Sequence, residues 1–183
     1  MEEWKKYKLE DLTTDGKGHY GIGAPAVDHD ENLFTYLRIT DINDDGSLNY
    51  SGLKSVDDLE AEKYLLNEGD IVFARTGNST GRAYYYDPSD GPLVYAGFLI
   101  KFSLDPLKVN PRYIKYYTHS KPYYDWVHSF DTGATRGNIN AQTLASMPIV
   151  LPPRAQQDNI VNILDALEDR RKCNAKINDN VAA

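Results

Sequence analysis

The chain has 183 residues, 26% of them charged, and a formal net charge of −7 at pH 7. This length favours one domain with an appendage over two complete domains. The sequence contains no run of about 18 apolar residues, the length needed to cross a bilayer. Residues 1–6 also lack the apolar stretch of a signal peptide. We therefore expect a cytoplasmic protein without a membrane segment. Cys173 is the only cysteine, which excludes an internal disulfide and a cysteine-rich metal site.

The charge is unevenly distributed. Residues 1–70 carry seven Lys and Arg against seventeen Asp and Glu, whereas residues 71–137 carry eight against five. The second segment also holds fourteen of the 21 aromatic residues. Basic side chains interleaved with aromatics are typical of a surface that contacts nucleic acid, although half-buried aromatics of strands and helices give the same pattern. The negative net charge of the whole chain therefore does not exclude DNA binding.

The first third of the chain predicts short strands separated by loops. Residues 4–12 predict a strand followed by a turn, and a loop rich in Gly, His and Pro spans residues 15–30. Residues 34–42 alternate between apolar and polar side chains and are rich in β-formers. A turn signal at 43–46 leads to a partner strand at 47–50. We expect a hairpin there.

The middle of the chain predicts a buried sheet. Residues 56–66 have the apolar spacing of one or two helical turns. The continuously apolar run Ile71–Arg75 indicates a strand buried on both faces, and residues 82–86 return as its hairpin partner after a loop that two glycines frame. We expect the apolar run 93–102 to continue the sheet.

Helices dominate the last third. Pro111 begins one amphipathic helix, a second lies around residues 123–130, and Pro152-Pro153 separates the last strand from a long helix. The mixture predicts an α+β fold. We expect a compact, mainly antiparallel domain with short helices over residues 1–151, followed by one coiled-coil-type helix over 152–183.

The long helix has an apolar stripe with two possible partners. Its members recur at three- and four-residue spacing, with a polar interruption before the last of them. The helix either folds back on its own domain or pairs with a second helix from outside the chain. The stripe consists of Ile160, Ile163, Leu164, Leu167 and Ile177.

Two polar loops are the best candidates for contact with DNA. In the major groove Arg pairs with guanine and Asn with adenine, and small hydroxyls or backbone amides ahead of a helix capped by Asn140 suit phosphate. The alternatives are a solvated hairpin tip and a helix-capping loop. The first loop offers Arg75, Thr76, Asn78, Ser79, Thr80 and Arg82, and the second offers Thr132, Thr135, Arg136 and Asn138, with support from Tyr20 and Arg38.

Catalytic machinery cannot be identified in the sequence. Residues 110–113 resemble the Asp/Asn-Pro-Pro-Tyr/Phe motif of adenine methyltransferases, but Arg112 breaks it, and no glycine-rich cofactor loop precedes it. The four histidines have no metal-binding spacing. We therefore predict no cofactor and no metal. A methyltransferase or nuclease fragment that uses residues 110–113 remains an alternative, as does a protein-binding module with an acidic face.

Three blocks of the chain resemble the specificity subunit of type I restriction-modification systems. The first is residues 4–12 with the loop that follows and the strand 36–42. The second is Glu68–Gly77 with Thr80-Gly81. In the third, residues 133–163, a small polar loop, a short helix, a buried strand, a double proline and a long helix follow one another.

The resemblance implies a non-catalytic subunit that binds double-stranded DNA. One recognition domain reads half of a bipartite site, helices pair to space two such domains, and the subunit recruits methyltransferase and restriction subunits. Family members typically hold two domains and two helices. The resemblance thus implies either half of a larger subunit or a half-subunit that dimerises through residues 154–180, in which case the site is palindromic.

Overall fold

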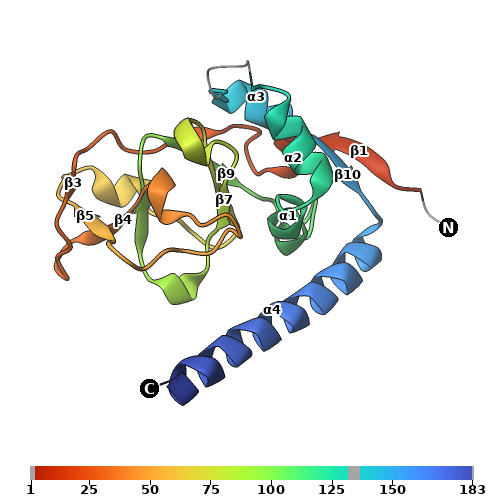
Figure 1. Cartoon of the computed structure of the whole chain (residues 1–183). Coiled ribbons are helices and arrows are strands. Elements are labelled where there is room, and N and C mark those ends of the chain that lie inside the picture. Colours follow the sequence, from red (N-terminus) through yellow and green to blue (C-terminus); the bar gives the residue numbers. More distant parts are fainter. Residues whose placement is uncertain (1–2, 132–136, 183) are drawn as a thin grey trace.

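The computed structural model describes residues 3–131 and 137–182. Strands and short helices form a domain, and one long helix runs beneath it (Figure 1). The predicted α+β class is confirmed. The strands are β1 Lys5–Lys8, β2 His19–Tyr20, β3 Ala26–Val27, β4 Phe34–Leu37, β5 Lys54–Val56, β6 Asp70–Ala74, β7 Ala83–Tyr85, β8 Leu93–Tyr95, β9 Leu99–Ser103 and β10 Pro148–Leu151. The α-helices are α1 Pro111–Tyr117, α2 Lys121–His128, α3 Ala141–Ala145 and α4 Arg154–Ala182.

The central sheet has the antiparallel order β2-β9-β6-β7. All five residues of β6 are buried because both faces of the strand are covered. Ile71 and Phe73 belong to a core that includes residues of α1, α2 and α3, while Val72 and Ala74 face a second core with Leu37. The continuous apolar run therefore reflects burial on two faces, as predicted.

The second sheet has the order β3-β5-β4-β8, with β4 and β8 parallel. Two predictions hold only in part here. The run 93–102 forms two strands in different sheets, because the chain turns at Ala96–Phe98, where Leu99 N–H donates to Ala96 O. The expected partner at 47–50 does pair antiparallel across the turn, through the Ile42–Leu48 bridge and the hydrogen bonds from Asn43 N–H to Ser47 O and from Asn49 N–H to Asp41 O. Strand β4 itself pairs instead with β5 and β8.

A two-stranded ribbon closes the domain. Strand β1 pairs antiparallel with β10, with Lys5 opposite Leu151 and Lys8 opposite Pro148. Ile149 and Leu151 face the core, so the outer face of the ribbon carries the alternate residues. The ribbon brings the beginning of the chain beside the strand from which α4 departs.

Helix α4 has 29 residues, or roughly 43 Å at 1.5 Å per residue. Val161 in its second turn is buried in the main core, and Ile160 is partly buried there. The helix then passes along α1 and extends beneath the sheets (Figure 1). Within the described residues, no helix combines the length and apolarity needed to span a membrane.

Candidate nucleic-acid interface

Arg75 is held by two aromatic rings. It follows β6, and its Cζ lies 5.3 Å from the centroid of the Tyr20 ring and 6.0 Å from that of Phe98. Its Nε is buried and has no hydrogen-bond partner among the described residues. No described carboxylate forms an ion pair with this arginine. Cation–π contacts orient the guanidinium and leave the donors on its two Nη atoms available for an external acceptor, whereas the buried Nε is not accessible to one.

Three loops converge on Arg75 through backbone contacts. Arg75 N–H donates to Phe98 O at 3.1 Å, and Ile139 N–H donates to Arg75 O at 2.9 Å. Tyr20 lies on β2, and its hydroxyl accepts a hydrogen bond from Ala141 N–H at 3.2 Å, where α3 begins. The rings of Tyr20 and Phe98 are 44% and 56% exposed. The arginine is therefore fixed from several sides on an open surface.

The hairpin loop between β6 and β7 was correctly predicted, and its polar residues have different surroundings. Asn78 is exposed and Thr76 is partly exposed, whereas Ser79 is buried. Thr80 Oγ1 donates to Gly77 O at 2.8 Å and to Gly137 O at 3.2 Å. Thr80 thus ties the hairpin to the second loop, and Asn78 faces solvent.

Gly81 shows why this loop requires glycine. Its φ is +86°, and a Cβ there would lie 2.5 Å from a methyl group of Val127 on α2. Both the backbone conformation and the close approach therefore exclude a side chain. The glycine seats the hairpin against α2.

Arg38 and Arg82 bind partners within the domain. Arg38 forms a two-pronged pair with Asp41, with Nε at 2.9 Å and Nη2 at 2.7 Å from its carboxylate oxygens. Arg82 donates to Ile42 O at 3.0 Å and pairs with Asp44 at 2.7 Å. Both arginines stabilise the segment that follows β4, unlike Arg75.

The second predicted loop is only partly described. Thr132, Thr135 and Arg136 lie outside the described residues. Asn138 is exposed, next to the residue that hydrogen-bonds Arg75. Asn140 caps α3 as predicted, since its side chain accepts from Thr143 N–H at 2.8 Å.

Two features of the surface were missed from the sequence. The sequence prediction included Phe98 in the apolar run 93–102. The glycine before this aromatic residue, at 97–98, is a usable signal for a turn. Phe98 also lines an apolar groove of about 560 Å³ between the loops at 22–26 and 38–40. The second feature is β1, where Lys5, Lys6 and Lys8 are all exposed, with Trp4 and Tyr7 among them.

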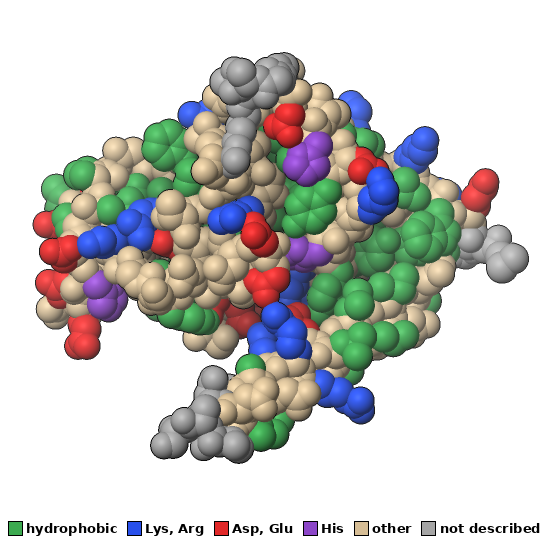
Figure 2. Space-filling view, viewed as in Figure 1, with side chains coloured by type: hydrophobic (Ala, Val, Ile, Leu, Met, Phe, Trp, Pro, Cys, Tyr) green, Lys and Arg blue, Asp and Glu red, His purple; other side chains and the backbone are tan. Residues whose placement is uncertain are grey.

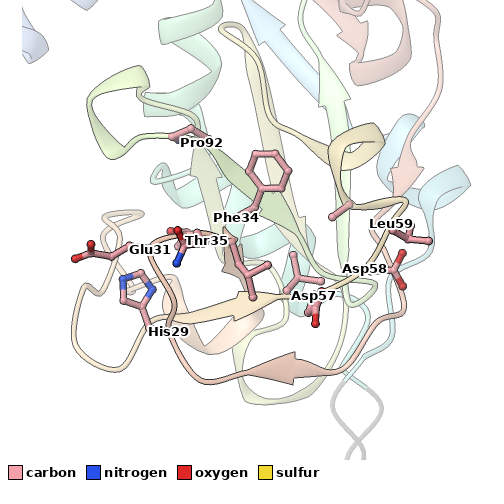
Figure 3. Close-up of a pocket in the computed structure, with 12 residues that line it drawn as sticks. His29, Glu31, Phe34, Thr35, Asp57, Asp58, Leu59 and Pro92 are labelled. Atoms are coloured by element: carbon pink, nitrogen blue, oxygen red, sulfur yellow. The ribbon is translucent and has the colours of Figure 1, made fainter.

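The end of the domain formed by β3 and β5 carries several acidic side chains (Figure 2). A pocket of about 530 Å³ lies there, and Figure 3 shows Glu31, Asp57 and Asp58 around Phe34. Acidic side chains gather at this end of the molecule, the end formed by β3 and β5 (Figure 2). Carboxylates repel phosphate, so this end does not suit a DNA backbone.

The stripe on α4 divides between two environments. Ile160 and Leu164 are partly buried, whereas Ile163, Leu167 and Ile177 are 63%, 57% and 53% exposed. Hydrophobic side chains also gather on the surface between β1 and the start of α4 (Figure 2). The helix thus contacts its own domain and still presents apolar side chains to solvent.

Residues 110–113 have a structural role at the contact between α1 and α4. Asn110 caps α1 by accepting from Arg112 N–H at 3.0 Å, and its amide donates to Asp158 on α4 at 2.7 Å. Arg112 pairs with Asp165 at 2.8 Å. These residues join α1 to α4.

Comparison with known proteins establishes the family. The model of the type I restriction modification DNA specificity domain matches residues 1–183. The chain belongs to this family. The resemblance seen in the sequence is thereby confirmed.

Relatives of the specificity-domain family are longer than this chain. The type I restriction enzyme StySPI specificity subunit of Salmonella potsdam is 26% identical over 141 residues, which cover 74% of this chain and 30% of that protein. A structure reported for complex assembly and conformational transition of the type I R-M system has a TM-score of 0.66 at 15% identity, over 93% of this chain and 44% of that chain.

Two further structures share the fold. The HsdS subunit from Thermoanaerobacter tengcongensis has a TM-score of 0.61 at 17% identity, covering 92% of this chain and 43% of its own. The S subunit of a type I restriction-modification system from M. genitalium has a TM-score of 0.62 at 17% identity, covering 95% and 41%. The chain spans less than half the length of each of these proteins.

Proposed function

We propose that this specificity domain reads one half of a bipartite double-stranded DNA target, without catalytic activity of its own. In this proposal it recruits the methyltransferase and restriction subunits of a type I system. The observation that carries the proposal is the Arg75 guanidinium, held against Tyr20 and Phe98 where three loops meet. An arginine on an open surface, without a described carboxylate partner, suits the O6 and N7 atoms of guanine.

The surrounding polar residues complete the proposed contact surface. Thr76, Asn78 and Asn138 lie on the two loops beside Arg75 and are exposed or partly exposed, and the same loops include Thr135 and Arg136. Arg38, Arg82, Ser79 and Thr80 support this surface from within the domain. We assign base contact to the first group and scaffolding to the second.

The second part of the proposal concerns α4. We infer that Ile163, Leu167 and Ile177 pair with a helix from outside the chain, because an apolar stripe with such exposure is stabilised when a second helix covers it. The partner is a second recognition half or a second copy of this chain. Identical copies related by a two-fold axis would read an inverted repeat. Sedimentation of the chain against a variant with Ile163→Asp and Leu167→Asp tests the pairing, and a monomer in both cases would count against it.

DNA reading is tested by sequencing the methylated sites of cells that express the chain with its methyltransferase subunit. We expect a bipartite adenine-methylation motif that requires the chain, and loss of discrimination at one base of the half-site in Arg75→Ala. Lys121→Ala is the matched control, because Lys121 is exposed and pairs within its own helix with Asp125. A motif that persists unchanged in Arg75→Ala overturns the assignment of this arginine, and one that persists without the chain overturns the function.

A further inference from the structure

The contact between α1 and α4 is made largely by charged and polar side chains. Lys115 Nζ lies 2.5 Å from Glu168 Oε2, and Arg112 lies within 3.0 Å of Asp165 through both Nε and Nη2. The Tyr116 hydroxyl contacts Asp165 and lies 2.9 Å from Glu168 Oε2. We call these five residues the clasp.

Further contacts on either side of the clasp restrict how α4 can tilt. Asn110 hydrogen-bonds both Gln157 and Asp158 on the N-terminal side. Arg171 pairs with Asp45 at 2.8 Å on the other side. Asp158 and Arg171 are roughly 20 Å apart along the helix. Contacts in the clasp and on either side of it hold the axis of α4 at one angle to the domain.

The clasp also sets the rotation of α4 about its axis. Residues 158, 161, 165, 168 and 172 follow three- and four-residue spacing and lie on one face of the helix, and the first four contact the domain. Ile163, Leu167 and Ile177 lie on another face and are exposed. An amphipathic helix usually buries its apolar stripe against its own domain. In α4 the face that carries the clasp carboxylates contacts the domain instead.

The chemistry of the clasp favours one geometry. Asp165 and Glu168 side chains are only 27% and 18% exposed. Burial alone would raise the pKa of Glu168, but hydrogen bonds and charge from Lys115, with help from Tyr116 and Lys172, lower it to about 2. Paired, partly buried carboxylates lose these bonds when a helix slides or rotates, whereas apolar contacts tolerate such movement.

We propose that Arg112, Lys115, Tyr116, Asp165 and Glu168 are positioning residues that fix the direction of α4 relative to the DNA-reading surface, and thereby the spacing between two half-sites. This rests on the proposed reading of a bipartite site. The helix continues about 25 Å beyond Asp165, so a tilt of roughly 15° moves its end by about 6 Å, or about two base-pair steps. Half-site spacing therefore depends on the clasp as well as on helix length.

The geometry is testable with the natural cysteine. Cys173 is exposed on α4, and Leu59→Cys supplies a second site on a fully exposed side chain of the domain. Spin labels at both positions should give one narrow distance distribution, with the Cys173-only protein correcting for pairs between copies. We expect Asp165→Asn with Glu168→Gln to at least double the width. Asp169→Asn, an exposed acid on the same helix outside the clasp, should leave it unchanged.

The functional readout is the spacer in the methylated motif. We expect the clasp variant to accept spacers changed by one or two base pairs while both half-site sequences stay the same. Arg75→Ala should leave the spacer unchanged and lose discrimination at one base of the half-site. A failure of the clasp proposal is therefore distinguishable from a failure of DNA reading. Unchanged label distances and spacers in a variant with a wild-type thermal transition overturn the proposal. If the double variant unfolds, Asp165→Asn alone provides the same two readouts.

Discussion

The Arg75 surface and the clasp use the same side chain in opposite ways. Arg75 lies against two aromatic rings with an unpartnered Nε, whereas Arg112 is paired with Asp165, and that hydrogen bonding raises its pKa although burial alone would lower it. An arginine that is oriented but unpaired keeps its donors for a ligand, and one that is paired fixes two elements together. The first should govern DNA affinity, and the second should govern geometry and stability.

The largest expected effect separates these roles directly. Arg75→Ala should reduce affinity for the cognate half-site by about 1–3 kcal/mol, the range for a two-pronged base contact. It should lower the free energy of unfolding by about 1–2 kcal/mol, because the side chain is partly buried and its removal deletes two cation–π contacts of about 0.5–1 kcal/mol each. Fluorescence anisotropy with cognate and scrambled duplexes measures the first, and urea unfolding measures the second. Equal loss on both duplexes would mean a phosphate contact.

Acid should release the clasp as a whole. The pKa of Glu168 is lowered from 4.5 to about 2. The pKa of Asp45, which lies outside the clasp, is lowered from 3.8 to about 2 although burial opposes it, mainly by hydrogen bonds from Ser47 and in smaller part by Arg171. A carboxylate with a depressed folded-state pKa contributes stability that is present above its unfolded value and is lost as the pH falls through its folded value. Label distances from Cys173 should therefore be constant from pH 8 to 5 and should broaden between about pH 4.5 and 2. A width that does not change in that window contradicts the pairing.

Breaking one side of the clasp should have a smaller effect. Arg112→Ala should lower the free energy of unfolding by about 1 kcal/mol, because the pair is partly exposed and such pairs are weak. Affinity for a single half-site should not change. Denaturant unfolding and anisotropy on one half-site check the two statements, and a loss of half-site affinity would show that the two regions are coupled.

Removing one ring beside Arg75 should have the smallest effect. Phe98→Ala deletes one of two cation–π contacts, each worth about 0.5–1 kcal/mol at an exposed site, so the free energy of unfolding should fall by about that amount. Because Arg75 is then less well oriented, cognate affinity should fall roughly two- to fivefold. Phe98→Tyr keeps a ring face and is the matched control. A loss as large as that of Arg75→Ala would mean that Phe98 touches DNA itself.

Features that depend on a few neighbouring residues could be predicted from the sequence. The buried strand β6 follows from one apolar run, the cap of α3 from Asn140, and the start of α4 from the double proline at 152–153. Each is fixed by local propensity or by burial of a short segment. The pair of Arg38 with Asp41, three residues apart, is also local and could have been foreseen.

Features that depend on distant pairing could not be predicted. The run 93–102 gives no sign that its two halves join different sheets, and the parallel pairing of β4 with β8 joins segments far apart in the sequence. Arg112 and Asp165 are 53 residues apart. The sequence shows which side chains are charged, but whether an arginine meets a carboxylate or two rings is decided by the tertiary fold.

The ribbon of β1 and β10 has a consequence for modular exchange. Lys5 lies opposite Leu151, so the chain enters the domain and leaves it toward α4 at the same edge. Everything between the two strands can be replaced by another domain with the same ribbon without moving the start of the helix. Because Arg112, Lys115 and Tyr116 lie inside the replaced part, a transplanted domain keeps the direction of α4 only if it carries matching partners for Asp165 and Glu168.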